Sequence, residues 1–305
     1  IIVFIRENYM SQISYGDAHG LYRVQIGLVG DDGYNYGTAG EEMANGTTSS
    51  AYVIRFATAA EMAMPDRTVI DFTGGDVWTG SYVHGITSLG SFSLTLSTVD
   101  ATLISIVTQI QVDKTTNSRW AIFSDNILLP TPKQIWMATT FRIQSKEPGT
   151  KGASKFIHQI VPRCWLSPKG ISGAPNFQAA GNYGFTIVPS IGEKLPHGIQ
   201  FSETQNFAEN ETPMVYLITD NPIHFVGHKA GAGVSSVITL PFSPVGVQAD
   251  YNTPDSSSQA IQVVVNGVVT DATTIDVANR TVTVATTAGD YVGILYETPL
   301  RIVSA

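Results

Sequence analysis

Short runs in which apolar and small polar residues alternate dominate the sequence, and this period of two constrains the fold more than any other feature. In residues 91–97, Phe92, Leu94 and Leu96 alternate with serine and threonine, as expected for a strand with one buried face. Only 14% of the residues are charged and 28 are glycine, which favours strands over helices. The sequence therefore predicts an all-β fold. A longer run, residues 133–145, places on one face Ile135, Met137, Thr139, Phe141 and Ile143.

One hairpin and one main helix are predicted in the first half of the chain. Residues 68–97 indicate strand, tight turn and strand, since the glycines of the turn are free to adopt positive φ. The stretch of about 98–110 repeats apolar residues at helical spacing, which predicts an amphipathic helix lying on the sheet. The turn contains Gly74, Gly75 and Asp76, just before Trp78, and the helical stripe contains Val99, Leu103, Ile106, Val107 and Ile110.

Further strands are predicted at residues 155–168, 182–189 and 214–219. Pro162 lies inside the first of them. Because proline cannot donate a hydrogen bond to a ladder, it indicates either an edge position or a bulge.

After about residue 221 the chain consists of short alternating runs separated by turns. Residues 261–269 hold an Asn-Gly pair between two apolar runs, a strong signal for a two-residue hairpin. This spacing is typical of a small β-sandwich. We therefore expect a β-sandwich or barrel over residues 1–222 and a small C-terminal β-sandwich over residues 223–305.

Residues 30–50 form a long stretch without periodicity and contain five glycines. Long loops inside a compact domain are uncommon and are usually functional or mobile. Tyr34, Tyr36 and Met43 are apolar groups that a solvated loop does not need, so a partner-binding loop is favoured over a plain surface loop.

The charge balance argues against some classes of partner. The chain has 25 acidic and 17 basic residues, a net charge of -8, whereas a protein that neutralises phosphates is normally basic. No run reaches the ~20 apolar residues of a membrane span, and no membrane partner is expected. Cys164 is the only cysteine, so no intrachain disulfide can form, and its apolar neighbours predict a buried thiol rather than a reactive one.

Residues that could carry catalysis are scattered. His224 and His228 have the spacing of a helical metal pair, but Pro222 and Gly227 disfavour a helix there, so a segment at the domain junction is favoured. Ser81 lacks the surroundings of a hydrolase nucleophile. We therefore predict no enzymatic activity, no metal and no cofactor.

In their order, these elements resemble the major tail tube protein of tailed bacteriophages. In that family a hairpin with a GG(D)xW-like turn leads to an FxLxLS strand and a single helix, and residues 156–170 and 182–190 resemble its later segments. The resemblance covers about residues 1–220, and residues 223–305 look like the immunoglobulin-like domains that often decorate such tubes. The positions that carry it are Gly74, Gly75, Asp76, Trp78, Phe92, Leu94, Leu96 and Ala101.

The resemblance implies a virion structural protein, made in the host cytoplasm, without enzymatic activity or cofactor. Family members form rings, usually hexameric, that stack into a hollow tail through which DNA passes at ejection. The implied partners are other copies of the chain, a tape measure protein and the terminator and tip proteins of the tail, with transient, non-specific passage of viral DNA. A net acidic chain fits a lumen that must not hold phosphate.

The resemblance also assigns contacts between copies. Residues 30–50 would join successive rings, an insert at residues 114–130 would form a second contact, and residues 223–305 would lie on the tube exterior. The expected contact residues are Tyr34, Tyr36, Glu41, Glu42, Met43, Trp120 and Phe123. The residues expected to build the hairpin, strand and helix are Gly74, Gly75, Asp76, Trp78, Phe92, Leu94, Leu96, Leu103, Ile106 and Val107.

Three other classes of protein stay open. A phage capsid or decoration protein shares the β-rich, disulfide-free composition. A carbohydrate-binding adhesin would use aromatic residues such as Trp78, Trp120 and Tyr34 as stacking platforms. A glycosidase would need two carboxylates, for which Asp71 and Asp76 beside the hairpin turn are the candidates.

Overall fold

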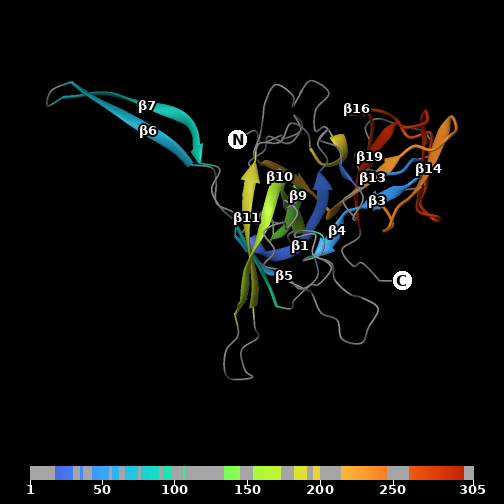
Figure 1. Ribbon diagram of the computed structural model, residues 1–305, viewed down its shortest axis with the longest axis horizontal. Helices are drawn as coiled ribbons and strands as arrows, with labels where there is room; N and C mark the ends of the chain where they lie inside the picture. Colours follow the sequence, from blue (N-terminus) through green and yellow to red (C-terminus); the bar gives the residue numbers. More distant parts are fainter. Residues whose placement is uncertain are drawn as a thin grey trace, which may run out of the picture.

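The computed structural model arranges the described chain as one large sheet, two smaller sheets and a separate hairpin (Figure 1). Almost every described segment is a β-strand, so the predicted all-β class is confirmed. The residues that the structure describes are 18–29, 35–36, 43–54, 57–61, 66–74, 77–88, 92–97, 103, 106, 134–144, 154–172, 182–190, 195–199, 214–245 and 261–298.

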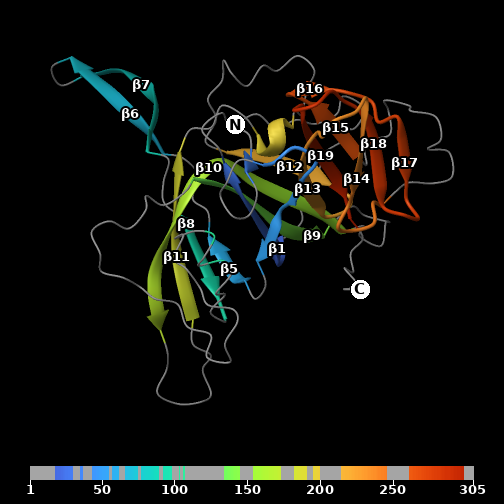
Figure 2. The ribbon, with the colours of Figure 1, turned by 45° about the vertical axis from the view of Figure 1, so that its right-hand side comes forward.

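The largest sheet, which we call the main sheet, has nine antiparallel strands and curls into a nearly closed barrel (Figure 2). Its order is β2-β1-β9-β10-β11-β8-β5, with β4 also paired to β1 and β12 also paired to β10. The strands are β1 (Ala18–Val29), β2 (Asn35–Tyr36), β4 (Tyr52–Ile54), β5 (Ala57–Glu61), β8 (Phe92–Leu96), β9 (Ile135–Gln144), β10 (Ser154–Ser172), β11 (Asn182–Ser190) and β12 (Val215–Thr219).

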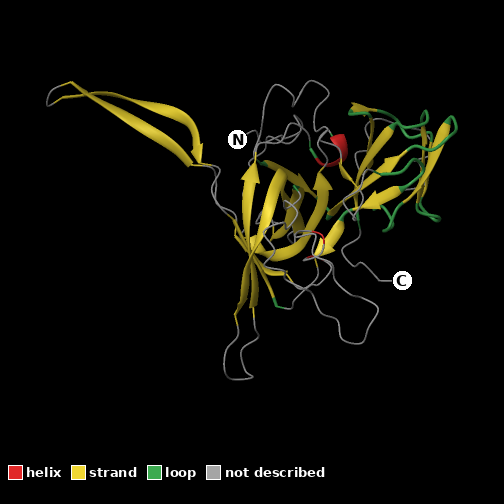
Figure 3. Cartoon of the chain, viewed as in Figure 1, coloured by secondary structure: helices red, strands yellow, loops and turns green. Residues whose placement is uncertain are grey.

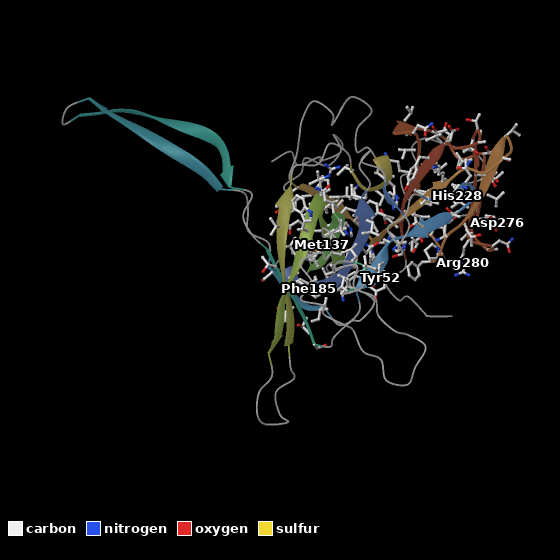
Figure 4. The ribbon with its side chains drawn as sticks, viewed as in Figure 1. Tyr52, Met137, Phe185, His228, Asp276 and Arg280 are labelled. Atoms are coloured by element: carbon white, nitrogen blue, oxygen red, sulfur yellow. The ribbon has the colours of Figure 1, made fainter. Side chains whose placement is uncertain are left out.

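Apolar residues from six of these strands fill the inside of the main sheet. Ile135 and Met137 of β9 are fully buried there beside Val24 and Ile26 of β1, on the face that the alternation predicted. Met137 and Phe185 lie among the strands of this sheet in Figure 4. The inner face of the main sheet is therefore a continuous core.

The structure describes two residues of the helix predicted at about 98–110. Leu103 and Ile106 are in helical conformation and are buried in the same core. The remaining positions, Val107 among them, lie outside the described residues, so the helix itself stays a prediction.

β10 crosses the main sheet and changes register at Pro162. The first part of β10 pairs with β9 and β12, and the second part with β11. The register with β9 shifts between Val161 and Cys164. Pro162 therefore lies at a bulge between paired strands, and of the two predicted alternatives the bulge is confirmed.

Two smaller sheets pack together as a C-terminal sandwich. Val226 and Ile294 of the first sheet are buried with Ile238 and Val284 of the second. The first sheet has the order β16-β15-β19-β13-β3 and the second β14-β18-β17. Their strands are β3 (Thr48–Ser50), β13 (Ile223–Lys229), β14 (Ser235–Thr239), β15 (Ile261–Val265), β16 (Val268–Val269), β17 (Thr274–Asp276), β18 (Thr281–Ala285) and β19 (Tyr291–Glu297).

The predicted Asn-Gly turn joins β15 to β16. Asn266 has a φ of 51° and Gly267 a φ of 81°, and positive φ at both central residues is the geometry of a type I′ hairpin turn. This hairpin is therefore confirmed.

One strand of the C-terminal sandwich comes from the N-terminal part of the chain. β3 pairs with β13, with Thr48 opposite His228, and after Ala51 the chain enters the main sheet as β4. The prediction of a loop throughout residues 30–50 is therefore wrong at β2 and β3. Strands of two and three residues carry too few positions for an alternation to be recognised.

The main sheet and the C-terminal sandwich share a hydrophobic layer, which we call the seam. Trp136 and Ala138 of β9 face this layer while Ile135 and Met137 face the barrel interior, so both faces of β9 are buried. The ring of Phe225 lies 5.0 Å from that of Trp136. The seam consists of Ala51, Trp136, Ala138, Ile160, Leu195, Ile199, Val215, Ile223, Phe225, Val264 and Leu295.

A hairpin of β6 (Asp66–Gly74) and β7 (Val77–Ser88) stands apart from the other strands (Figure 3). Among the described strands, β6 and β7 pair only with each other, and the last pair joins Gly74 and Val77. The predicted hairpin is therefore confirmed, while Gly75 and Asp76 at its turn lie outside the described residues.

We expect the thiol of Cys164 to be inert in the folded protein. Cys164 is fully buried, and burial raises the pKa of its thiol, so the reactive thiolate is scarce. Alkylation by iodoacetamide at pH 8 should be at least about a thousandfold slower than in the unfolded chain, because labelling requires an opening that costs several kcal/mol. Mass spectrometry follows the reaction at this single cysteine, with urea-unfolded protein as the control. Rapid labelling without urea would contradict the buried core.

Replacing Phe225 with alanine tests whether the seam is a true core. Phe225 is fully buried, and Phe225→Ala should lower the free energy of unfolding by about 3–5 kcal/mol through lost burial and a cavity. Val237→Ala is the control, since Val237 is 63% exposed and its loss should cost at most about 0.5 kcal/mol. Urea titration measures both variants, and similar small values would argue against a shared core.

Candidate functional site

The structure describes only part of the predicted contact set. Tyr36 lies in β2, while Tyr34, Glu41, Glu42, Trp120 and Phe123 lie outside the described residues. Met43 is only 5% exposed, and its sulfur accepts a hydrogen bond of 3.4 Å from the Tyr291 hydroxyl. Met43 is therefore engaged within its own chain, whereas a loop contact with another copy was predicted for it.

Of the residues predicted to build the hairpin, the strand and the helix, the structure again describes only part. Leu94 and Leu96 are fully buried in the main core, which confirms their predicted inward face, and Phe92 begins β8. Gly74 and Trp78 lie in the hairpin strands.

The best-defined polar site is at the seam, around a one-turn 3-10 helix, η1 (Pro196–Gly198). His197 of η1 is 2% exposed, and its ring stacks on Tyr291 at 6.3 Å and meets Trp136 edge-on at 6.0 Å. A Cβ atom on Gly227 would lie 2.3 Å from His197 Nδ1, and one on Gly293 would lie 2.1 Å from the His197 carbonyl oxygen. Glycines on β13 and β19 therefore make the room that the imidazole occupies.

A buried arginine lies beside the seam. Arg23 of β1 is 4% exposed, and its Nη1 donates to the Ile223 carbonyl and to Thr298 Oγ1, both at 3.3 Å. Gln25 Nε2 donates to the same Ile223 carbonyl at 2.7 Å. The guanidinium also lies 5.6 Å from the ring of Tyr22 and 5.8 Å from that of Phe242. β1 therefore holds the start of β13 through two side chains.

Two histidines lie on β13 itself, as strand residues, so the predicted exclusion of a helix is confirmed. His224 is fully buried between the rings of Phe242 at 4.8 Å and Tyr296 at 5.8 Å. Within the described part of the chain, neither ring nitrogen of His224 has a hydrogen-bond partner. His228 Nδ1 and Thr48 Oγ1 are 2.9 Å apart and form a hydrogen bond between β13 and β3; Figure 4 shows His228 in the C-terminal sandwich.

Burial keeps these imidazoles neutral. Loss of hydration lowers the pKa of His197 to about 3 and the pKa of His224 well below 6.5, with the nearby Arg23 charge as a second cause. The pKa of His228 is also lowered by burial. An uncharged imidazole is thus the stable form at neutral pH.

The described residues contain no group of three or more His, Cys, Asp or Glu side chains able to hold a metal ion. Asp71 pairs in register with Ser81 in the hairpin, and Asp76 lies outside the described residues. Among the described residues, no helix is both long and apolar enough to cross a membrane.

Exposed strand edges and the hairpin form the second candidate surface. Among the described strands, β5 pairs with β8 alone, and β10 beyond Cys164 pairs only with β11. Unpaired edges and an isolated hairpin are features that pairing with another chain would satisfy.

Sequence reasoning missed the polar residues at the seam. Arg23 and Gln25 alternate with Val24 and Ile26 as on any half-exposed strand, and nothing in that pattern marks the polar face as buried. Trp136 was the one available signal, because a tryptophan on the second face of β9 suggests that this face is covered too.

Comparisons with known proteins identify no family. No protein-family model matches the chain, and a search of curated proteins finds no match.

We expect Gly227→Ala to destabilise the protein by about 1–3 kcal/mol, because the added methyl group would overlap the buried ring of His197. Gly231→Ala, two residues after the end of β13, is a matched control. Its Cβ would lie 3.4 Å from the nearest atom, an ordinary contact. The entropic effect of replacing glycine with alanine is common to both variants. Thermal unfolding measures the difference, and equal melting temperatures would contradict the close packing.

Proposed function

We propose that this chain is a virion structural protein that polymerises into stacked rings, forming a phage tail tube through which DNA is ejected. The observation that carries the proposal is the β6–β7 hairpin. A two-stranded hairpin is marginally stable alone in water, yet this one pairs with no other described strand. A neighbouring copy would supply the missing contacts.

The distribution of residues in the hairpin supports a protein partner. In the register of the two strands, Ile70 pairs with Tyr82 and Val69 pairs with Val83. Apolar residue types in successive pairs suit a groove between packed subunits better than solvent.

Strand edges and charge support the same proposal. Beyond Cys164, the side of β10 away from β11 pairs with no other described strand, and it would let sheets of adjacent subunits join into a continuous wall. The net charge of -8 would repel phosphates from that wall and let DNA slide. In this proposal the rings are hexameric, the tape measure, terminator and tip proteins are the partners, and the C-terminal sandwich lies outside the tube.

We expect the purified chain to form rods of constant bore, visible by negative-stain electron microscopy, and Phe72→Asp to abolish them by placing a charge in the hairpin strand β6. Val237→Asp, on an exposed position of β14, is the control and should still assemble. Slow alkylation of Cys164 in both variants would show that each subunit is folded.

Sedimentation velocity at rising concentration, together with the same micrographs, distinguishes the outcomes that would contradict this proposal. A wild-type chain that stays monomeric at high concentration would remove the proposal. Closed shells or isolated trimers would favour a capsid or decoration protein instead. Rods from Phe72→Asp would retain the tube and exclude the hairpin as its contact.

A further inference from the structure

Three buried imidazoles meet at one strand, β13. His224 and His228 lie on one face of it, and His197 presses on its other face at Gly227. β13 is also the strand that joins the parts of the molecule, because it pairs with β3 and β19 and contributes Ile223 and Phe225 to the seam.

The surroundings of His224 favour a neutral ring. Its two nitrogens are buried without a hydrogen-bond partner among the described residues, and its neighbours Phe242 and Tyr296 are aromatic. An imidazolium has two N–H donors and a charge, and both would be left unsatisfied in this position.

The fixed charge nearest to His224 has the same sign as an imidazolium. Arg23 is buried, and no ion pair joins it to a carboxylate among the described residues. The ionisable groups beside the three rings, among the described residues, are Arg23 on β1 and Tyr291 and Tyr296 on β19. Neither tyrosine is charged at or below neutral pH, so among the described residues Arg23 opposes protonation of His224 and no acid offsets it.

We propose that β13 is an acid-sensitive latch: protonation of His197, His224 and His228 releases β13 from β3 and from the main sheet, and the seam opens while the main sheet stays folded. The proposal does not depend on the tube assembly.

The direction of the effect follows from the two states. In the closed state the pKa of His197 is about 3 and that of His224 is well below its ordinary value, whereas in an opened, hydrated state each imidazole returns to about 6.5. The opened state therefore binds more protons below about pH 6.5. The stability of the closed latch is complete above that pH and is lost as the pH falls toward 3.

The main sheet has its own buried histidine, but one that is fully hydrogen-bonded. His158 Nδ1 lies 2.9 Å from Thr140 Oγ1 and its Nε2 lies 2.7 Å from Thr219 Oγ1, although burial also lowers its pKa to about 3. It sits within the long ladders of β9, β10 and β12, which must all break before it is hydrated. As the pH falls, the latch should therefore open before the main sheet unfolds.

Hydrogen exchange of the full chain, measured by mass spectrometry at pH 7.5 and about pH 5 and corrected for intrinsic exchange rates, tests the latch. Peptides covering 48–54 and 223–230 should lose protection by at least about thirtyfold at the lower pH, the factor expected for one imidazole with an exposed pKa of 6.5. Peptides covering 135–144 and 156–164, in the main sheet, should keep their protection from exchange. Unchanged protection of the first pair, or equal loss in both pairs, would overturn the proposal.

Two variants assign the effect to these side chains. His224→Leu keeps an apolar ring-sized group without a titrating nitrogen and should reduce the acid-induced loss about tenfold or more, with little change at pH 7.5. Arg23→Met removes the repelling charge together with the hydrogen bonds to Ile223 and Thr298, so opening should rise at both pH values while the ratio of opening between pH 5 and pH 7.5 falls. His84→Leu, on the hairpin strand β7, is the control and should behave as wild type. Wild-type acid sensitivity in both test variants would refute the latch.

Discussion

Burial of both faces of β9 is the constraint on which the rest of the structure depends. One face fills the barrel with Ile135 and Met137, and the other presents Trp136 to the seam. The indole lies so close to β1 that a Cβ on Gly27 would be 2.3 Å from its Nε1. Because both faces of β9 carry buried apolar residues, the C-terminal sandwich covers the second face of the main sheet, and the two parts pack closely in the closed protein.

Polar groups determine how that cover is placed. Arg23 and Gln25 both donate to the carbonyl of Ile223, which fixes where β13 starts relative to β1. Hydrophobic layers alone tolerate sliding, whereas a buried donor that loses its acceptor costs about 1–3 kcal/mol. Burying the Arg23 charge is costly, and its hydrogen bonds to Ile223 and Thr298 tie β1 to the start of β13 and to the residue after β19.

Patterns in the sequence predicted the elements whose conformation depends on residues close by in the chain. The alternation located β8 and β9, the Asn-Gly pair located the β15–β16 turn, and Pro162 indicated either an edge or a bulge, because each depends on neighbours in sequence. The seam could not be predicted, since Arg23 and Gln25 look like residues of a solvated face until β13 covers them. β3 was missed for the same reason: three residues form a strand only because β13 pairs with them. The orientation of His197 depends on Gly227 and Gly293, which are far away along the chain.

The route of the chain through β3 has a consequence for synthesis. Thr48 reaches its partner His228 across a separation of 180 residues, and Arg23 reaches Thr298 across 275. On the ribosome the N-terminal half therefore emerges with its second face uncovered and its polar groups unmatched until the last strands are made. Long-range closure of this kind is slow and exposes sticky surface during translation, so the nascent chain is the stage at which this protein is most open to premature association.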